Sequence, residues 1–181
     1  MLNEKVICAG FGGQGVMSMG QLLTYAGMLE GKEVSWLPSY GPEMRGGTAN
    51  CSVMIAETPI GSPIITDDAT AAIVMNLPSL DKFEADVAPG GVIIVNSSLI
   101  AKKVVREDVK AYYVAANEIA QDLGNLKIAN MVILGAYLEL AKPVEPSSVI
   151  AALKKVLGPS KAHLIPINED ALSRGADAVR G

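Results

Sequence analysis

The sequence predicts an α/β fold: a three-layer, Rossmann-like domain built around a mostly parallel and partly mixed sheet. A short apolar segment at 5–9 runs into a glycine-rich turn and then into a helical pattern that reaches residue 30. Apolar segments of strand length continue to alternate with helical patterns along the chain. Half of the 181 residues are hydrophobic and only 19% are charged, which predicts a well-buried core. We expect one domain over residues 1–181, because no linker, repeat or low-complexity tract interrupts the pattern.

The first third of the chain predicts a strand–helix–strand unit with a right-handed crossover. Val16, Met19 and Leu23 fall on one face of the helix, and Gly31 ends it. A Gly- and Pro-rich loop follows, then a strand, then a turn whose short second arm would form a hairpin and make the sheet mixed. The predicted elements are a strand at 5–9, a helix at about 13–30, a strand at 33–37, an ordered loop at 38–47, a strand at 48–56, a turn at 58–62 and an arm at 63–66.

The remainder of the chain returns to simple alternation and ends in helices. The final helix is predicted to begin at Asn168, a good N-cap residue, with Glu169 and Asp170 complementing the helix dipole. The predicted elements are a strand at 70–75, a helix at 76–87, a turn at 89–90, strands at 91–96 and 111–115, and helices at 116–123, 126–141, 146–157 and about 168–179.

The turn after the first strand, Gly10-Phe11-Gly12-Gly13-Gln14-Gly15, matches the G-x-G-x-x-G pattern of dinucleotide-binding turns. Its glycines permit a tight turn and bring backbone N–H groups close to an anion at a helix N-terminus. A tight turn that packs against a partner, or that binds no ligand, fits the same pattern. The candidate ligand- or interface-binding residues here are Gly10, Gly12, Gly13, Gln14 and Gly15.

A standard NAD or FAD site needs one more feature, an acidic residue at the end of the second strand that holds the ribose hydroxyls. The predicted second strand instead ends in Trp36-Leu37-Pro38-Ser39, which contains no carboxylate. Standard dinucleotide binding is therefore disfavoured.

The loop at 38–47 supplies a second set of candidate binding residues. The planar guanidinium of Arg45 suits a carboxylate or a phosphate, and the glycines beside it allow another backbone to approach closely. The alternative is a local surface ion pair between Glu43 and Arg45, worth under about 1 kcal/mol. Tyr40 and Met44 are candidate interface anchors. The full set is Tyr40, Glu43, Met44, Arg45, Gly46 and Gly47.

Two asparagines complete the candidate site. Asn96 ends a predicted strand, where ligand crevices of open sheets form, although a turn-forming Asn fits the position equally well. Asn130 lies in an otherwise apolar helix, so its amide needs a hydrogen-bond partner. That partner is either a ligand or the backbone of a neighbouring loop.

Composition narrows the function classes. The net charge of −4 and the lack of a basic run disfavour nucleic-acid binding. Neither a signal peptide nor a membrane span is recognisable, so a cytoplasmic protein is expected. Cys8 and Cys51 predict a buried, reduced pair, and without a Cys-x-x-Cys motif the chain cannot hold an iron–sulfur cluster alone. We also expect no metal on this chain, whose one histidine, His163, excludes a His-rich site.

The glycine turn, taken together with the segment Ser39-Tyr40-Gly41-Pro42-Glu43-Met44-Arg45-Gly46-Gly47, resembles the gamma subunit of 2-oxoacid:ferredoxin oxidoreductases. Residues 116–120 leading to 130–136 are also similar to that family, as are residues 168–172 with Gly175. The resemblance covers nearly the whole chain, and the two motifs together are more specific than either one alone.

The resemblance implies an accessory subunit of an enzyme that converts a 2-oxoacid and coenzyme A to acyl-CoA, CO2 and reduced ferredoxin. The substrate would be pyruvate, 2-oxoglutarate or a branched-chain 2-oxoacid such as ketoisovalerate. Alpha and beta subunits, and a ferredoxin-like delta subunit as a further partner, would carry the thiamine diphosphate, Mg and iron–sulfur clusters. The glycine turn would bind coenzyme A at a shared site, a phosphate, or only a neighbouring subunit; the sequence leaves these three open.

The residues themselves agree with this division of labour, because the sequence has no Gly-Asp pair to begin a thiamine-diphosphate motif. The isolated chain is therefore expected to be inactive, with no catalytic residue of its own. An independent nucleotide- or flavin-binding oxidoreductase domain and a non-catalytic binding module are the competing hypotheses.

Overall fold

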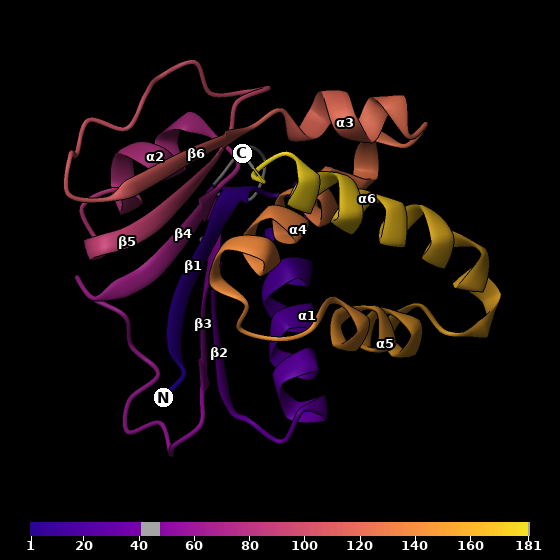
Figure 1. Cartoon of the computed structure of the whole chain (residues 1–181), viewed down its shortest axis with the longest axis horizontal. Coiled ribbons are helices and arrows are strands. Elements are labelled where there is room, and N and C mark those ends of the chain that lie inside the picture. The colour runs from indigo at the N-terminus through magenta and orange to yellow at the C-terminus, as the bar shows by residue number, and fades with distance from the viewer. Residues whose placement is uncertain (41–47, 181) are drawn as a thin grey trace.

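Residues 1–40 and 48–180 are described by the computed structural model, with Tyr40 described by its backbone alone. They form a six-stranded sheet in the order β2-β3-β1-β4-β5-β6 (Figure 1). Only β3 runs antiparallel to its neighbours within this described sheet, so the sheet is mostly parallel and partly mixed, as the sequence predicts. The strands are β1 (Asn3–Phe11), β2 (Glu33–Tyr40), β3 (Thr48–Ala56), β4 (Ala69–Val74), β5 (Val87–Asn96) and β6 (Lys110–Val114).

The antiparallel strand comes from a different hairpin than the one predicted. Residues 38–40 continue β2 instead of opening a loop, and β3 returns beside β2 with Ala49 opposite Tyr40. Pro38 is tolerated because β2 is an edge strand, where one side of the backbone has no ladder to join. The predicted arm at 63–66 forms no strand, since the Ile64 N–H is used in a local bond to the Ser62 hydroxyl, at 3.3 Å.

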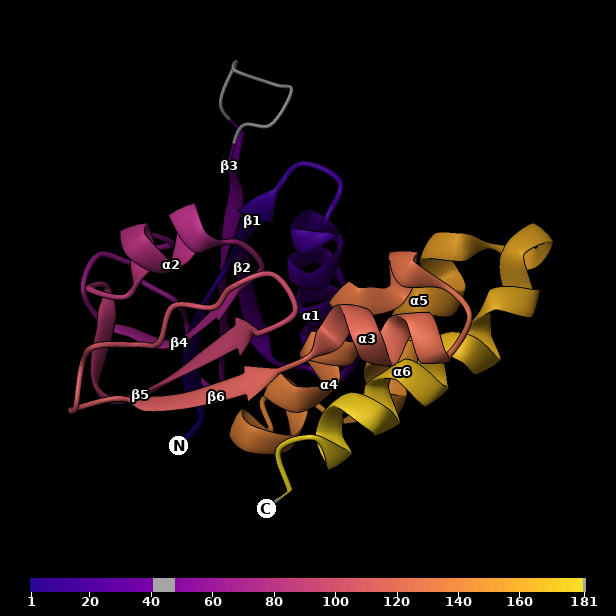
Figure 2. The ribbon, with the colours of Figure 1, turned by 90° about the horizontal axis from the view of Figure 1, so that it is seen from above.

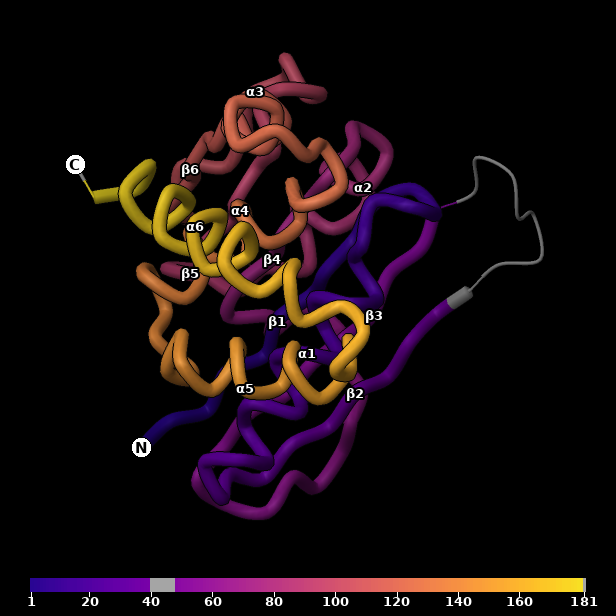
Figure 3. The backbone as a smooth tube through the Cα atoms, turned by 90° about the vertical axis from the view of Figure 1, so that its right-hand side faces the viewer, coloured from indigo at the N-terminus to yellow at the C-terminus, as the bar shows by residue number. Residues whose placement is uncertain are grey.

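Helices cover both faces of the sheet, which gives the three predicted layers (Figure 2). One face is covered by α1 and α4, with α5 and α6 packed outside them (Figure 3), and the other face by α2. The helices are α1 (Val16–Leu29), α2 (Leu77–Phe83), α3 (Ala116–Asp122), α4 (Ala129–Ala141), α5 (Pro146–Leu157) and α6 (Ile165–Asp177), with short 3-10 helices η1 (Leu126–Ile128) and η2 (Pro159–Leu164).

Predicted element boundaries around α2, β5 and α6 are wrong. The helix predicted at 76–87 ends at Phe83, because Val87 is buried opposite Ala69 and already belongs to β5, which also absorbs the turn predicted at 89–90. Asn168 does not cap the last helix, which begins at Ile165. Its side chain instead donates to the Leu164 carbonyl one turn earlier, at 2.7 Å.

The chain changes faces of the sheet between two neighbouring strands. After β1 it crosses into α1, and after the parallel neighbour β4 it enters α2 on the opposite face. In open α/β sheets, the carboxyl ends of strands at such a switch point border the ligand crevice. The fold therefore places the glycine turn, which follows β1, at this crevice.

Candidate functional site

The glycine turn is held to the end of β4 by the side chain of Gln14. Its Oε1 accepts a hydrogen bond from the Phe11 N–H at 2.6 Å, and its Nε2 donates to the Met75 carbonyl at 3.1 Å. A Cβ on Gly10 would lie 2.6 Å from that Oε1 and 2.9 Å from the Met75 Cβ. Gly10 is therefore required for the packing of the turn. Both the oxygen and the nitrogen of the Gln14 side-chain amide are used in hydrogen bonds that hold the turn in place.

The last glycine of the turn, Gly15, is the N-cap residue that precedes α1 and lies in the left-handed region at φ +76°. Asn130 on α4 donates from Nδ2 to the Gly15 carbonyl at 3.3 Å, and a Cβ on Gly15 would lie 2.5 Å from that nitrogen. The Asn130 amide thus meets the backbone of a neighbouring loop, one of the two partners that the sequence left open. Gly12 and Gly13 differ from Gly15, since a Cβ on either would meet only open space.

A small pocket of about 240 Å³ opens beside this turn. Gly13 and Gln14 border it on one side, and Asn130 lies on the α4 side. Two polar residues that line it, Asn117 and Lys127, are not among the candidate residues predicted from the sequence. Asn117 lies just beyond the carboxyl end of β6, a position that the rule for strand ends would have selected. Lys127 lies in the one-turn helix η1, for which the sequence offers no comparable signal.

Asn96 belongs to this site through Asn117. Asn96 is fully buried at the end of β5, and its Nδ2 donates to the Asn117 Oδ1 at 2.8 Å. The Asn117 N–H donates to the Ser98 hydroxyl at 3.0 Å, and that hydroxyl donates in turn to Glu118. The bond from Ser98 lowers the pKa of the Glu118 carboxyl. Asn96 does not line the pocket, but it fixes the side chain that does.

The pocket suits binding better than acid–base chemistry. The described residues that line it include three side-chain amides, Gly13 and the ammonium of Lys127, and no carboxylate, thiol or imidazole. At the adjoining N-terminus of α1, no side chain among the described residues caps the first N–H groups, and no acidic residue lies in the first turn. This end of the helix therefore keeps its partial positive charge for an anionic or polar group.

The position beside β1 argues further against a standard dinucleotide site. The ribose-binding carboxylate of such sites stands at the end of a strand next to β1. Here the neighbour on that side is the antiparallel β3, which begins rather than ends at this edge, and β2 lies one strand further out. Of the candidates on the following loop, Glu43, Met44, Arg45, Gly46 and Gly47 lie outside the described residues, and Tyr40 ends β2.

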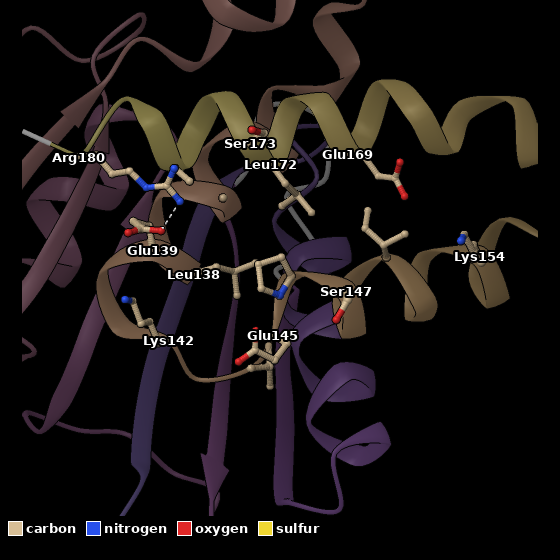
Figure 4. A pocket seen from close by; sticks show the side chains of 15 residues that line it. Leu138, Glu139, Lys142, Glu145, Ser147, Lys154, Glu169, Leu172, Ser173 and Arg180 are labelled. Atoms are coloured by element: carbon tan, nitrogen blue, oxygen red, sulfur yellow. Dashed lines mark hydrogen bonds and ion pairs between the residues drawn. The ribbon is translucent and has the colours of Figure 1, made fainter.

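A larger pocket, of about 720 Å³, lies elsewhere, among α4, α5 and α6 (Figure 4). Its wall carries charges of both signs, including an ion pair between Arg180 and Glu139 at 2.8 Å. Arg180 lowers the pKa of the Glu139 carboxyl. Glu139 lies near the end of α4 opposite to Asn130, so this groove is separate from the glycine turn.

The described residues contain neither a metal-ligand cluster nor a helix able to span a membrane. Among residues 1–40 and 48–180, no three His, Cys, Asp or Glu side chains are grouped so as to hold a metal ion. In the same part of the chain, none of the helices has both the length and the apolar character needed to cross a bilayer.

Comparison with known proteins shows the family. Residues 5–178 match the model of the family described as pyruvate ferredoxin/flavodoxin oxidoreductase. The chain belongs to this family. Among the members that it resembles is the 2-oxoglutarate synthase subunit KorC of Methanocaldococcus jannaschii, at 34% identity over 156 residues, covering 84% of this chain and 82% of KorC. The resemblance predicted from the two motifs is thereby confirmed.

Other oxidoreductase family members are longer than this chain. The ketoisovalerate oxidoreductase subunit VorA of Methanothermobacter marburgensis is 39% identical over 177 residues, covering 97% of this chain but only 36% of VorA. The chain thus spans about a third of the length of that relative.

Solved structures of the oxidoreductase family confirm the fold. The gamma subunit of a keto/oxoacid ferredoxin oxidoreductase from Geobacter sulfurreducens superposes with a TM-score of 0.81 at 26% identity, covering 97% of each chain. A 2-oxoglutarate:ferredoxin oxidoreductase from Magnetococcus marinus shares the fold with a TM-score of 0.88 at 21% identity, over 99% of this chain and 31% of its own.

Proposed function

We propose that the chain is the gamma-type subunit of a 2-oxoacid:ferredoxin oxidoreductase, which converts a 2-oxoacid and coenzyme A to acyl-CoA, CO2 and reduced ferredoxin. The observation that carries the proposal is the match to KorC, which covers most of both chains. Relatives named for ketoisovalerate, 2-oxoglutarate and pyruvate all occur, so the proposal covers the class of 2-oxoacids and not one substrate.

In this proposal the chain binds and positions, and its partners carry out the cofactor chemistry. The sequence has two cysteines, fewer than an iron–sulfur cluster needs, and both are buried opposite each other in the sheet. The donor set therefore does not fit a cluster. Thiamine diphosphate, Mg and the clusters are assigned to alpha, beta and delta-type partner subunits, with ferredoxin as the electron acceptor of the assembly.

We assign the contact with the assembly to the carboxyl edge of the sheet. Gly12 and Gly13 leave open space at the turn, and Lys127 adds a positive charge beside it. A phosphate of coenzyme A or a carboxylate of a neighbouring subunit would suit this edge, and Arg45 on the adjoining loop would add a second cation. The relative from Magnetococcus marinus, which shares the fold, was solved with coenzyme A bound.

Reconstitution tests the proposal. The purified chain, alone and with its co-purified partner subunits, would be assayed for reduction of a viologen dye with a 2-oxoacid and coenzyme A. We expect no turnover by the chain alone and turnover by the assembly, with the partners identified by mass spectrometry of the native complex. Turnover by the isolated chain, or an active partner assembly that gains nothing from this chain, would contradict the proposal.

Calorimetric titration separates this function from that of an independent dinucleotide-binding domain. We expect NAD and FAD to bind weakly or not at all, since β3 occupies the place beside β1. A dissociation constant near or below about 1 μM, roughly −8 kcal/mol, would instead show a dinucleotide site.

A further inference from the structure

The two cysteines of the chain lie directly opposite each other across the antiparallel pair β1–β3. Cys8 on β1 is in register with Cys51 on β3. Both side chains are fully buried and both thiols are free. Residues paired in this way project to the same face of a sheet with Cα atoms roughly 4.5–5.5 Å apart, which lies within the Cα spacing of about 4.4–6.8 Å that disulfides span.

The sulfur of Cys51 occupies a space shaped around it. Its Sγ donates to the Val16 carbonyl at 3.5 Å, and the indole nitrogen of Trp36 lies, like this sulfur, beside Gly20 of α1. A Cβ on Gly20 would lie 2.4 Å from this sulfur, so only glycine fits that position of α1. A hydrogen bond from the Cys8 thiol, with further bonds from Trp36 and the Gly20 N–H, lowers the pKa of Cys51 although burial opposes the shift.

Cys51 is also the cysteine nearer to the edge of the sheet. In its row of the sheet, Cys8 lies on the inner side and Pro38 of the edge strand β2 lies on the outer side. Pro38 is exposed, and Trp36 on the same strand is 36% exposed. Both thiols are buried, but Cys51 lies one strand in from the edge and Cys8 lies two strands in, so we expect an oxidant that enters at the edge to meet Cys51 first.

We propose that Cys8 and Cys51 form a redox-active dithiol that closes to a cross-strand disulfide when the protein meets hydrogen peroxide. In the first step the Cys51 sulfur attacks a peroxide oxygen; the O–O bond breaks, and sulfenic acid and water form. In the second step the Cys8 sulfur attacks that sulfenic sulfur, the S–O bond breaks, and a second water leaves with the thiol proton. Overall, two thiols lose two electrons and two protons to one peroxide, which becomes two waters.

Closure of the bridge would act at the candidate site. Cys8 lies two residues before Gly10, and Cys51 lies three residues after Thr48, where β3 begins. The disulfide would tie together the strand that enters the glycine turn, β1, and the strand that begins at Thr48, β3. It would also end the donation from Cys51 to the Val16 carbonyl at the first residue of α1. Trp36, the only tryptophan in the sequence, would report the change because its indole nitrogen and the Cys51 sulfur lie beside the same residue, Gly20.

Peroxide treatment of the purified full-length chain, followed by alkylation in denaturant and mass spectrometry, tests the proposal. We expect the loss of both alkylatable thiols, a mass decrease of two hydrogen atoms, a peptide that joins Cys8 to Cys51, and full reversal by dithiothreitol. The Trp36 emission should change on oxidation and return on reduction. Two thiols that stay alkylatable while the folded chain is exposed to peroxide would overturn the proposal, as would a bridge that forms only in denaturant or only between two chains.

Two single variants test the order of attack. In Cys8→Ser, the serine hydroxyl still donates to Cys51, so a sulfenic acid should accumulate and be trapped by dimedone. In Cys51→Ser, the remaining Cys8 is interior and should give little adduct under the same conditions. Circular dichroism of both variants checks that they fold. The opposite pattern of adducts would overturn the assignment of Cys51 as the attacked sulfur, and the joined peptide of the wild-type chain tests the bridge itself independently of both variants.

Discussion

The two ends of α4 carry two very different pockets. At its N-terminal end, the small pocket beside the glycine turn is built from amides whose orientation is fixed by bonds to backbone or to each other. At its C-terminal end, the groove among α4, α5 and α6 is three times as large but is lined by exposed charges of both signs. Volume alone would select the groove. Fixed side chains, an uncapped helix N-terminus and the switch point of the sheet select the small pocket instead.

The largest effect is expected between the two pockets, where α4 and α6 touch backbone to backbone. A Cβ on Gly175 would lie 1.7 Å from the Val132 carbonyl oxygen, which cannot move without disturbing α4. Gly175→Ala should therefore destabilise the fold by about 3 kcal/mol or more, through overpacking. Urea unfolding followed by circular dichroism measures this. Gly61→Ala, where a Cβ meets open space, is the matched control and should change the free energy of unfolding by less than about 0.5 kcal/mol.

A second pair of variants separates structure from binding within the glycine turn. Gly15→Ala forces a Cβ into the left-handed region and against Asn130, so it should cost about 2 kcal/mol of stability. Gly12→Ala meets open space and needs no positive φ, so its stability should stay within about 0.5 kcal/mol of the wild type. In the reconstituted assembly, however, Gly12→Ala should lower activity, because the added methyl group stands where a ligand or partner would approach. Full activity of Gly12→Ala would show that the turn is only a structural element.

Asn130 tests whether the small pocket depends on its fixed amides. Asn130→Ala removes the donor to the Gly15 carbonyl and should cost about 1 kcal/mol of stability, the usual net value of one hydrogen bond. Asn130→Asp should cost more, since a carboxylate in this nearly buried place would face a carbonyl oxygen. Chemical denaturation of both variants measures the difference. Equal stability of wild type and Asn130→Ala would mean that the bond contributes nothing to holding α4 against the turn.

The sequence predicts the fold well where periodicity and local chemistry agree. The strand at 48–56 and the helix at 146–157 match the structure at both ends, because apolar spacing and flanking turn residues mark the same boundaries. The arm at 63–66 and the helix start at Asn168 fail, because in each case a different local hydrogen bond forms, from Ile64 to Ser62 and from Asn168 to Leu164. The pairing of β3 between β1 and β2 could not be predicted, since no local feature specifies which strands become neighbours.

The candidate site was predicted in part. The glycines and Gln14 are predicted as site residues from their spacing directly after a strand. Asn96 is predicted from its position at the end of a strand. Asn117 and Lys127 reach the same pocket from α3 and η1, elements that only the packed fold brings to the turn. The structure also shows that the side-chain amides of Asn130 and Asn96 donate hydrogen bonds to other protein groups, which a pattern of residue types cannot reveal.

The smallest effect is expected in the large groove. Arg180 lowers the pKa of Glu139, so their pair stabilises the fold above the ordinary glutamate pKa of 4.5, and this contribution is lost as the pH falls through the lowered value. Arg180→Ala should thus lower the unfolding midpoint slightly at pH 7, less so in high salt, and not at all at a pH well below both pKa values. Lys154→Ala, on the same wall, is the control and should show no such pH dependence. Neither variant should alter the activity of the reconstituted assembly. A large loss of activity in Arg180→Ala with an unchanged fold would contradict this prediction. It would show that the groove, and not the small pocket alone, is a functional site of the assembly.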